Sequence, residues 1–240
     1  MYDKVWVNSS VTILPDNAAA DGGYFKVVAL TTQTYQPFYK DGKLALERDK
    51  NQFSTGKRVR DQKLALRRII LRTRPLSNEY PEYYDRYVSL VPEGDIVEIL
   101  HEQQTKTIIL LNSVSEEYAG KAYAPGKWTL KEVIGHMSDT ERVMSYRMLA
   151  MARNEGTPLQ GMDQDLYVSS AKFDQFSWVQ LHTDLKTVRS ATLSLISTVD
   201  DEAWIRKGTV WNVPVSTRAF AYIIAGHELH HLKVICDKYL

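Results

Sequence analysis

The stretch AGHELHHLKVI, residues 225–235, places three histidines and one glutamate among apolar residues. In a helix each residue advances about 100° around the axis, so His227 and His231 lie about 40° apart. Both fall in the middle of the apolar stripe of the predicted helix, whereas Glu228 and His230 fall at its edges. Histidines four residues apart on one helix face can bind the same metal ion. The stretch therefore predicts a helix that supplies two ligands of a metal site.

The same letters satisfy the pattern H-E-x-x-H of zinc proteases, with His227, Glu228 and His231 in the three specified positions. The extended form of that pattern places a third ligand downstream. Only nine residues follow His231 in this sequence, so we expect the third ligand to come from upstream and do not expect a protease of this kind. Cys236 falls on the opposite side of the helix, which argues against it as a ligand.

The best upstream candidate is His136, in the segment EVIGHMSDTE. It lies at the edge of the apolar stripe of another predicted helix. Gly135 before it costs about 1 kcal/mol of helix stability relative to alanine, which indicates that another group approaches closely there. A lone buried histidine is usually a satisfied core residue, but three without partners would be costly to bury. We therefore predict that His136, His227 and His231 bind one divalent metal ion, Zn²⁺ or Ni²⁺, and that His230 does not.

Composition limits the class of protein. The chain of 240 residues has 44% hydrophobic letters, enough for one large domain. Its single cysteine excludes a disulfide within the chain and suits a reducing compartment. The first residues lack the pattern of a signal peptide, and no apolar run reaches the length of a membrane span. We expect a soluble, cytoplasmic protein without a membrane partner.

The net charge of +1 hides an asymmetry along the chain. Residues 1–74 contain 14 Lys and Arg against 7 Asp and Glu, whereas the remainder contains 16 against 22. We expect residues 1–73 to form a basic N-terminal extension, weakly structured or of uncertain fold, and residues 74–240 to form the main domain.

The extension contains two kinds of pattern. Strand-like character marks the segments DKVWV, SVTIL and YFKVVALTTQTY. The basic segment KRVRDQKLALRRIILRTR, residues 57–74, is either an amphipathic helix that contacts nucleic acid or an anionic membrane, or a loosely ordered stretch. The acidic remainder argues against a nucleic-acid partner.

From Pro92 onward the apolar residues recur with a helical period. The predicted long helices cover residues 92–114, 129–153, 177–198 and 216–240. The second and third begin with capping boxes, Thr129 to Glu132 and Ser177 to Gln180. A long connection separates these two, and a shorter one with a helical turn in DDEAWIRKG leads to the last. Four such helices can form a bundle, and bundle cores hold metal sites built from facing helices.

Other side chains are weaker candidates. Glu141 lies inside the apolar stripe of the second helix. It is either a carboxylate near the metal or the partner of an arginine. Trp128, Tyr167 and Glu141 are candidates for lining a pocket beside the metal. Glu98 and His101 match half of a di-iron pattern, but the sequence lacks the second half. A further apolar strip on the last helix suggests a homodimer; it consists of Tyr222, Leu229 and Leu232.

Four blocks of the sequence resemble one family. They read RPLSNEYPEYYDRYVSLVPEGDIVEIL, YAPGKWTLKEVIGHMSDTERVMSYRMLAMAR, TPLQGMDQDLYV and YIIAGHELHHLKVI. In order, spacing and flanks they look like the DinB/YfiT-like superfamily of damage-inducible-type bacterial proteins, over about residues 74–240. The resemblance implies an all-α fold, a four-helix bundle of DinB/YfiT type, in which three histidines bind a divalent metal. By motif these are again His136, His227 and His231.

The resemblance also implies a function. Members of the family are often described as metal-dependent hydrolases, and some are thiol-S-transferases that use low-molecular-weight thiols such as bacillithiol or mycothiol. We therefore expect an enzyme of one of these two types that acts on a small molecule. The alternative is a non-catalytic, stress-related bundle in which the metal stabilises the fold and the protein binds a ligand or a partner.

Overall fold

The computed structural model describes residues 35–40, 43–48, 72–157, 159–210 and 213–240. The chain divides into two compact units, residues 1–62 and 63–240. In the first unit, β1 (Tyr35–Lys40) and β2 (Lys43–Arg48) pair antiparallel, with Lys40 opposite Lys43. The intervening letters, Asp41-Gly42, are typical of a two-residue hairpin loop.

Sequence analysis missed this hairpin. It placed the nearest strand in YFKVVALTTQTY, which ends where β1 begins. The other predicted strands, and the predicted basic helix up to residue 71, lie outside the described residues.

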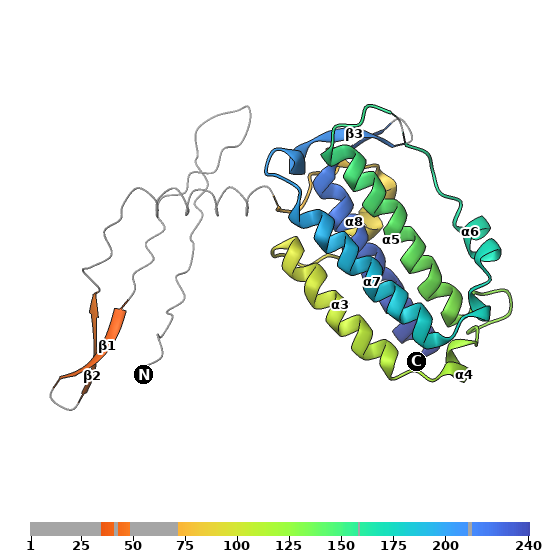
Figure 1. Ribbon diagram of the computed structural model, residues 1–240, viewed down its shortest axis with the longest axis horizontal. Helices are drawn as coiled ribbons and strands as arrows, with labels where there is room; N and C mark the ends of the chain where they lie inside the picture. Colours follow the sequence, from red (N-terminus) through yellow and green to blue (C-terminus); the bar gives the residue numbers. More distant parts are fainter. Residues whose placement is uncertain (1–34, 41–42, 49–71, 158, 211–212) are drawn as a thin grey trace. The chain divides into compact units, whose positions relative to one another are not determined.

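The second unit is a bundle of four long helices, which confirms the predicted fold class (Figure 1). They are α3 (Ile96–Asn112), α5 (Leu130–Ala152), α7 (Trp178–Ser197) and α8 (Thr217–Val234). The short helix α2 (Asp85–Val88) precedes them. Shorter elements lie between them: α4 (Glu116–Ala119), α6 (Gln164–Ala171) and the hairpin of β3 (Lys207–Val210) and β4 (Val213–Ser216). Among the described segments, none of the helices combines the length and apolar character needed to cross a bilayer.

The helices begin where the sequence places their caps. Thr129 and Ser177 each accept a hydrogen bond from the backbone three residues on, and both predicted capping boxes are present. Ser216 caps α8 in the same way. The last helix ends differently from the prediction, because the α-helix stops at Val234 and a π-helical turn, Ile235–Tyr239, follows it. The helical turn predicted in DDEAWIRKG is the 3-10 segment Ala203–Ile205.

Neighbouring helices in the bundle are partly parallel. In space, α3 contacts α7, α7 contacts α5, α5 contacts α8, and α8 contacts α3. Arg142 of α5 pairs with Asp184 of α7, and Arg153 after α5 bonds to Thr198 after α7, so these two helices run the same way. The long connection between them must therefore return along the bundle, and Figure 1 shows it passing outside α5 by way of α6.

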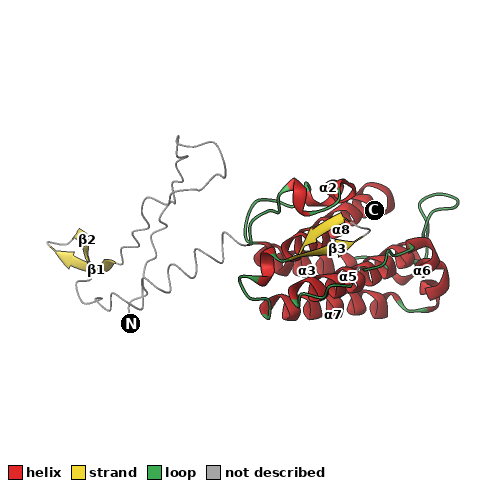
Figure 2. Cartoon of the chain, turned by 90° about the horizontal axis from the view of Figure 1, so that it is seen from above, coloured by secondary structure: helices red, strands yellow, loops and turns green. Residues whose placement is uncertain are grey.

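The short helix α2 covers one side of α8 (Figure 2). A side chain at Gly226 would overlap the backbone of Tyr87, so only glycine permits this approach. Similarly, a side chain at Gly135 would overlap the ring of Phe173, which is the close approach expected from the sequence.

The predicted dimer strip is partly covered by the chain itself. Tyr222 is buried, and its hydroxyl donates to the carbonyl of Arg72 at 3.2 Å. Leu229 and Leu232 are partly buried against the two core clusters. The homodimer remains a prediction: the chain itself covers Tyr222, whereas Leu229 and Leu232 keep part of their surface exposed.

The predicted division into residues 1–73 and 74–240 remains a prediction. We expect deletion of residues 1–62 to leave helical content, melting temperature and metal content unchanged, because the bundle's described contacts begin at Arg72. Deletion of residues 1–73 removes the Arg72 carbonyl that Tyr222 contacts, and we expect a lower melting temperature. Circular dichroism and elemental analysis of both deletions test this. An insoluble or metal-free protein after the shorter deletion would show that the first unit is an integral layer of the fold.

Candidate metal centre

The three predicted ligands meet between α5 and α8. His136 comes from the second turn of α5, and His227 and His231 come from successive turns of α8. Nε2 of His227 lies 3.2 Å from Nε2 of His136 and 3.1 Å from Nε2 of His231. One ligand atom from each ring lies within 4.8 Å of the other two. The structure therefore brings together the residues that the sequence selected.

This donor set fits a divalent metal ion. Two nitrogens that bind one tetrahedral zinc ion at about 2.0–2.1 Å lie about 3.3–3.4 Å apart. The separations of 3.1 and 3.2 Å are close to that value. Without a metal, Nε2 of His227 has one N–H or one lone pair in the ring plane, so it can form one good hydrogen bond with its two neighbours. A metal ion would satisfy all three nitrogens at once.

The environment keeps the three imidazoles neutral, which is the state that binds metals. Burial, followed by the nearby His230, lowers the pKa of His136 to about 4. Burial, with the charges of His136 and His230, lowers the pKa of His231 to about 3. His227 is the most enclosed, and burial followed by its histidine neighbours holds its pKa well below the ordinary value.

His230 points to the rim of the site. It is partly exposed, and its ring centroid lies 5.1 Å from that of His231 and 5.5 Å from that of Tyr87. Burial and the neighbouring Arg86 lower its pKa. Its position agrees with the prediction that His230 is not a ligand.

Glu228 is turned away from the histidines. Its carboxylate accepts hydrogen bonds from the hydroxyl of Thr107 and from Nη2 of Arg189, the latter at 2.5 Å. All three side chains are buried. Glu228 is therefore not placed as the general base that the H-E-x-x-H pattern requires, and this contact argues against a protease of that type.

Arg189 is also the ion-pair partner of Glu141. The guanidinium donates to both carboxylate oxygens of Glu141, at 2.8 and 2.9 Å, and to the carbonyl of Leu100 at 3.2 Å. Burial alone would lower the pKa of Arg189, but the charges of Glu141 and Glu228 outweigh it and raise the pKa. Of the two alternatives left by the sequence, Glu141 is the partner of an arginine.

Two aromatic rings flank the histidines. Trp128, a predicted pocket residue, lies with its ring 4.9 Å from that of His136. Tyr87 of α2 lies 5.3 Å from His227, in an edge-to-face arrangement. Sequence reasoning missed Tyr87, although the tyrosine-rich segment YPEYYDRYV and the glycine at position 226 were signals of a close contact. Burial, with Tyr83 next, raises the pKa of Tyr87 to about 12, so its hydroxyl stays protonated at neutral pH.

The remaining candidates lie elsewhere. Tyr167 is exposed and lines a separate pocket with Arg142 and Tyr146, on the outer side of α5. Glu98 and His101 are both exposed on α3, as expected for a solvated flank.

We predict that alanine at position 136, 227 or 231 greatly lowers metal content, because each change removes a direct bond to the ion. His230→Ala is the matched control, since its loss affects at most the surroundings of a ligand, an effect of about 10–100-fold in affinity. Metal stoichiometry and thermal melts with and without a chelator distinguish the four variants. Loss of metal from His230→Ala with retention in His231→Ala would show that the ligand assignment is wrong.

We also predict that the metal-free protein loses stability as the pH falls below about 6.5. The folded-state pKa values of His136 and His231, about 4 and about 3, lie below the ordinary value of 6.5. Between these values the unfolded chain binds protons that the folded chain does not, so the free energy of unfolding decreases as pH falls. Chelator-treated protein should show this in melts from pH 7.5 to 5, and His231→Gln should show a smaller dependence. An equal dependence in the variant would contradict the prediction.

Comparison with known proteins agrees with this fold. A curated protein of Oceanobacillus iheyensis named "Putative metal-dependent hydrolase" is 22% identical over 156 residues, which are 59% of this chain and 86% of that protein. YfiT from Bacillus subtilis, described as "a probable metal-dependent hydrolase with an unusual four-helix bundle topology", matches 70% of this chain and 98% of its own, with a TM-score of 0.52 and 14% identity. At that identity the likeness is one of fold.

Two further comparisons concern a solved structure and a family model. A mycothiol-dependent maleylpyruvate isomerase matches 57% of this chain and 58% of its own at 12% identity, with a TM-score of 0.49. The family described as the DinB superfamily matches residues 99–235, more than half of the chain. The chain therefore belongs to the DinB superfamily.

Proposed function

We propose that this chain is a divalent-metal-dependent enzyme that acts on a small molecule. The observation that carries the proposal is the convergence of three imidazoles: Nε2 of His227 lies 3.2 Å from Nε2 of His136 and 3.1 Å from Nε2 of His231. Three protein ligands leave a position open on a tetrahedral ion, as in catalytic zinc sites, whereas structural sites have four. Imidazole donors suit Zn²⁺ and Ni²⁺.

When bound, such an ion lowers the pKa of a water or thiol in its open position. The chain itself supplies neutral ligands and a shielded surrounding. His136 and His227 are buried, whereas His231 is partly exposed, so the substrate approaches from the side of His231. The rings of Trp128 and Tyr87 flank His136 and His227.

Of the two reaction types, thiol transfer suits the site better than hydrolysis. Zinc hydrolases of the H-E-x-x-H type use the glutamate to take a proton from water. Here the Glu228 carboxylate is bonded to Arg189 and Thr107, and Glu141 is bonded to the same arginine. A thiol, with a pKa of about 8.5 against about 15.7 for water, needs less help from a base.

We therefore propose a thiol-S-transferase that uses a low-molecular-weight thiol. Such thiols are kept reduced in the cytoplasm, which is also the compartment that the single cysteine favours. Hydrolysis is the second reaction type, and its test is included below.

A non-catalytic bundle is the alternative from another class. It is favoured by one observation: the histidines join α5 to α8, so a metal would hold these helices together even without turnover. In that case metal should raise the melting temperature, but no substrate should react.

The test starts with elemental analysis of the purified protein. The zinc- and nickel-loaded forms are then assayed with 2-mercaptoethanol or cysteine and monochlorobimane for thiol transfer, and with p-nitrophenyl acetate for hydrolysis. We expect metal-dependent thiol transfer that His231→Ala abolishes and that the exposed, distant change His101→Ala leaves intact. Ester hydrolysis without thiol transfer would reverse our choice of reaction. Metal binding without either reaction would favour the non-catalytic bundle.

A further inference from the structure

The accessible side of the histidine site borders on α2. His230 and His231 are partly exposed, so a substrate reaches the site past these two rings. His136 and His227 are buried. The ring of Tyr87, in α2, contacts those of His227 and His230, with centroid distances of 5.3 and 5.5 Å. Side chains of α2 are therefore placed to contact the part of a substrate that extends beyond the metal.

Arg86 brings a positive charge to this border. It is exposed, and its guanidinium carbon lies 5.7 Å from the centroid of the Tyr87 ring. Burial is the largest cause that lowers the pKa of His230, and the charge of Arg86 is the next, so the field of Arg86 reaches the rim of the histidine site. Among the described residues, no carboxylate forms an ion pair with Arg86. Lys233 of α8, by contrast, is already paired with Asp237 at 2.9 Å.

The guanidinium of Arg86 is held in one orientation. Its Nε donates a hydrogen bond to the carbonyl of Tyr83 at 3.0 Å, and its carbon lies 3.8 Å from the centroid of the Tyr83 ring. Tyr83 in turn packs edge-to-face on Tyr84 and Tyr87. A guanidinium stacked on a ring presents its edge to a ligand. The edge formed by Nη1 and Nη2 has no partner among the residues that the structure describes. An exposed arginine loses side-chain freedom when it binds a ligand, and Arg86 has already lost part of it.

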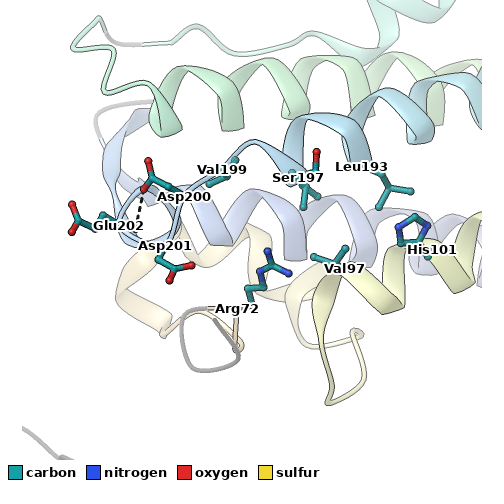
Figure 3. A pocket seen from close by; sticks show the side chains of 10 residues that line it. Arg72, Val97, His101, Leu193, Ser197, Val199, Asp200, Asp201 and Glu202 are labelled. Carbon is teal, nitrogen blue, oxygen red and sulfur yellow. Dashed lines mark hydrogen bonds between the residues drawn. The ribbon is translucent and has the colours of Figure 1, made fainter. Parts of the chain in front are cut away.

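Another arginine, Arg72, has a different environment. It lines a pocket of about 560 Å³ between α3 and the end of α7 (Figure 3). The same pocket is lined by Asp200, Asp201 and Glu202. Asp200 accepts hydrogen bonds from the backbone of Glu202 and Ala203, and Asp201 and Glu202 also have partners. An anionic ligand would meet these carboxylates beside the arginine, so this pocket does not favour an anion as Arg86 does.

The free edge of Arg86 matches one carboxylate. Two nitrogens of a guanidinium form parallel hydrogen bonds with the two oxygens of a carboxylate. A phosphate group carries about two negative charges near neutral pH and would need a further cation, which the paired Lys233 does not supply. Arg86 contacts the ring of Tyr87, and Tyr87 contacts His227, so the carboxylate must lie several bonds from the group that binds the metal.

We propose that Arg86 binds a carboxylate of the thiol substrate, several bonds from the sulfur that takes the open position on the metal. This inference rests on the proposed function and specifies its substrate class as low-molecular-weight thiols that carry a carboxylate. A neutral thiol of the same length binds more weakly, because it leaves the free edge of the guanidinium without a partner. Arg86 therefore determines which thiol binds, whereas the three histidines hold the metal.

Thiol binding to the full-length, cobalt-loaded protein tests the proposal. A thiolate bound to Co²⁺ gives a charge-transfer band in the near ultraviolet, so a titration reports the thiol at the metal without requiring turnover. The probes are 6-mercaptohexanoate and 6-mercapto-1-hexanol, which differ only in the terminal group. We expect the acid to bind at least about tenfold more tightly, because it forms hydrogen bonds between charged groups. Equal binding would overturn this inference and leave the proposed thiol chemistry intact, whereas binding of neither thiol would overturn both.

Variants assign the preference for the acid to Arg86. Arg86→Met keeps an apolar stem over Tyr83 but removes the charge, so we expect it to bind both thiols equally. Arg86→Lys should restore part of the preference, because it returns the charge without the two-nitrogen edge. Lys106→Met removes the same charge from an exposed position on α3 and is the control, which should keep the full preference. Melting curves and cobalt content confirm that each variant is folded. A preference for the acid that persists in folded Arg86→Met would refute the role of Arg86.

Discussion

The guanidinium of Arg189 is the interaction on which the bundle depends. From α7 it reaches Glu141 of α5, Glu228 of α8 and the carbonyl of Leu100 in α3, so one side chain contacts all the other long helices. Arg189 is only 3% exposed, and the two carboxylates are equally enclosed. Removing one member of a buried ion cluster leaves an unpaired charge, which costs about 3–5 kcal/mol. The four helices are therefore held in one register.

That register places the three histidines of the candidate metal centre. Glu228 directly follows His227, so its bond to Arg189 sets the rotation of α8 about its axis. Because the glutamate points inward to Arg189, the side chains of His227 and His231 face α5, where His136 lies. The same bond keeps the Glu228 carboxylate away from the open side of the site. Ligand placement and the lack of a nearby carboxylate base are thus two consequences of one contact.

Local signals in the sequence predicted the helices and the ligands. These signals depend on residues within one or two turns of one helix. They are the caps at Thr129 and Ser177 and the spacing of His227 and His231. Arg189 carried no such signal, because a single arginine among the polar letters of α7 does not reveal which carboxylates lie opposite. The burial of Tyr222 was equally hidden, since its contacts, the carbonyl of Arg72 and the guanidinium of Arg74, come from over a hundred positions earlier. The contacts of Arg189 and Tyr222 were missed because they join distant segments, whereas the hairpin of β1 and β2 was missed although it is local.

Arg189 and its two glutamates also explain why an ion cluster occupies the middle of an otherwise apolar core. Hydrophobic replacements of buried ion pairs are often as stable as the pairs they replace, so stability alone does not account for the cluster. An apolar layer tolerates small shifts of a helix by repacking. A guanidinium between two carboxylates does not tolerate such shifts, because any shift of α8 breaks a charged hydrogen bond. A metal site needs its ligands held to within about 0.5 Å. An ion cluster one residue from His227 supplies that constraint where packing alone would not.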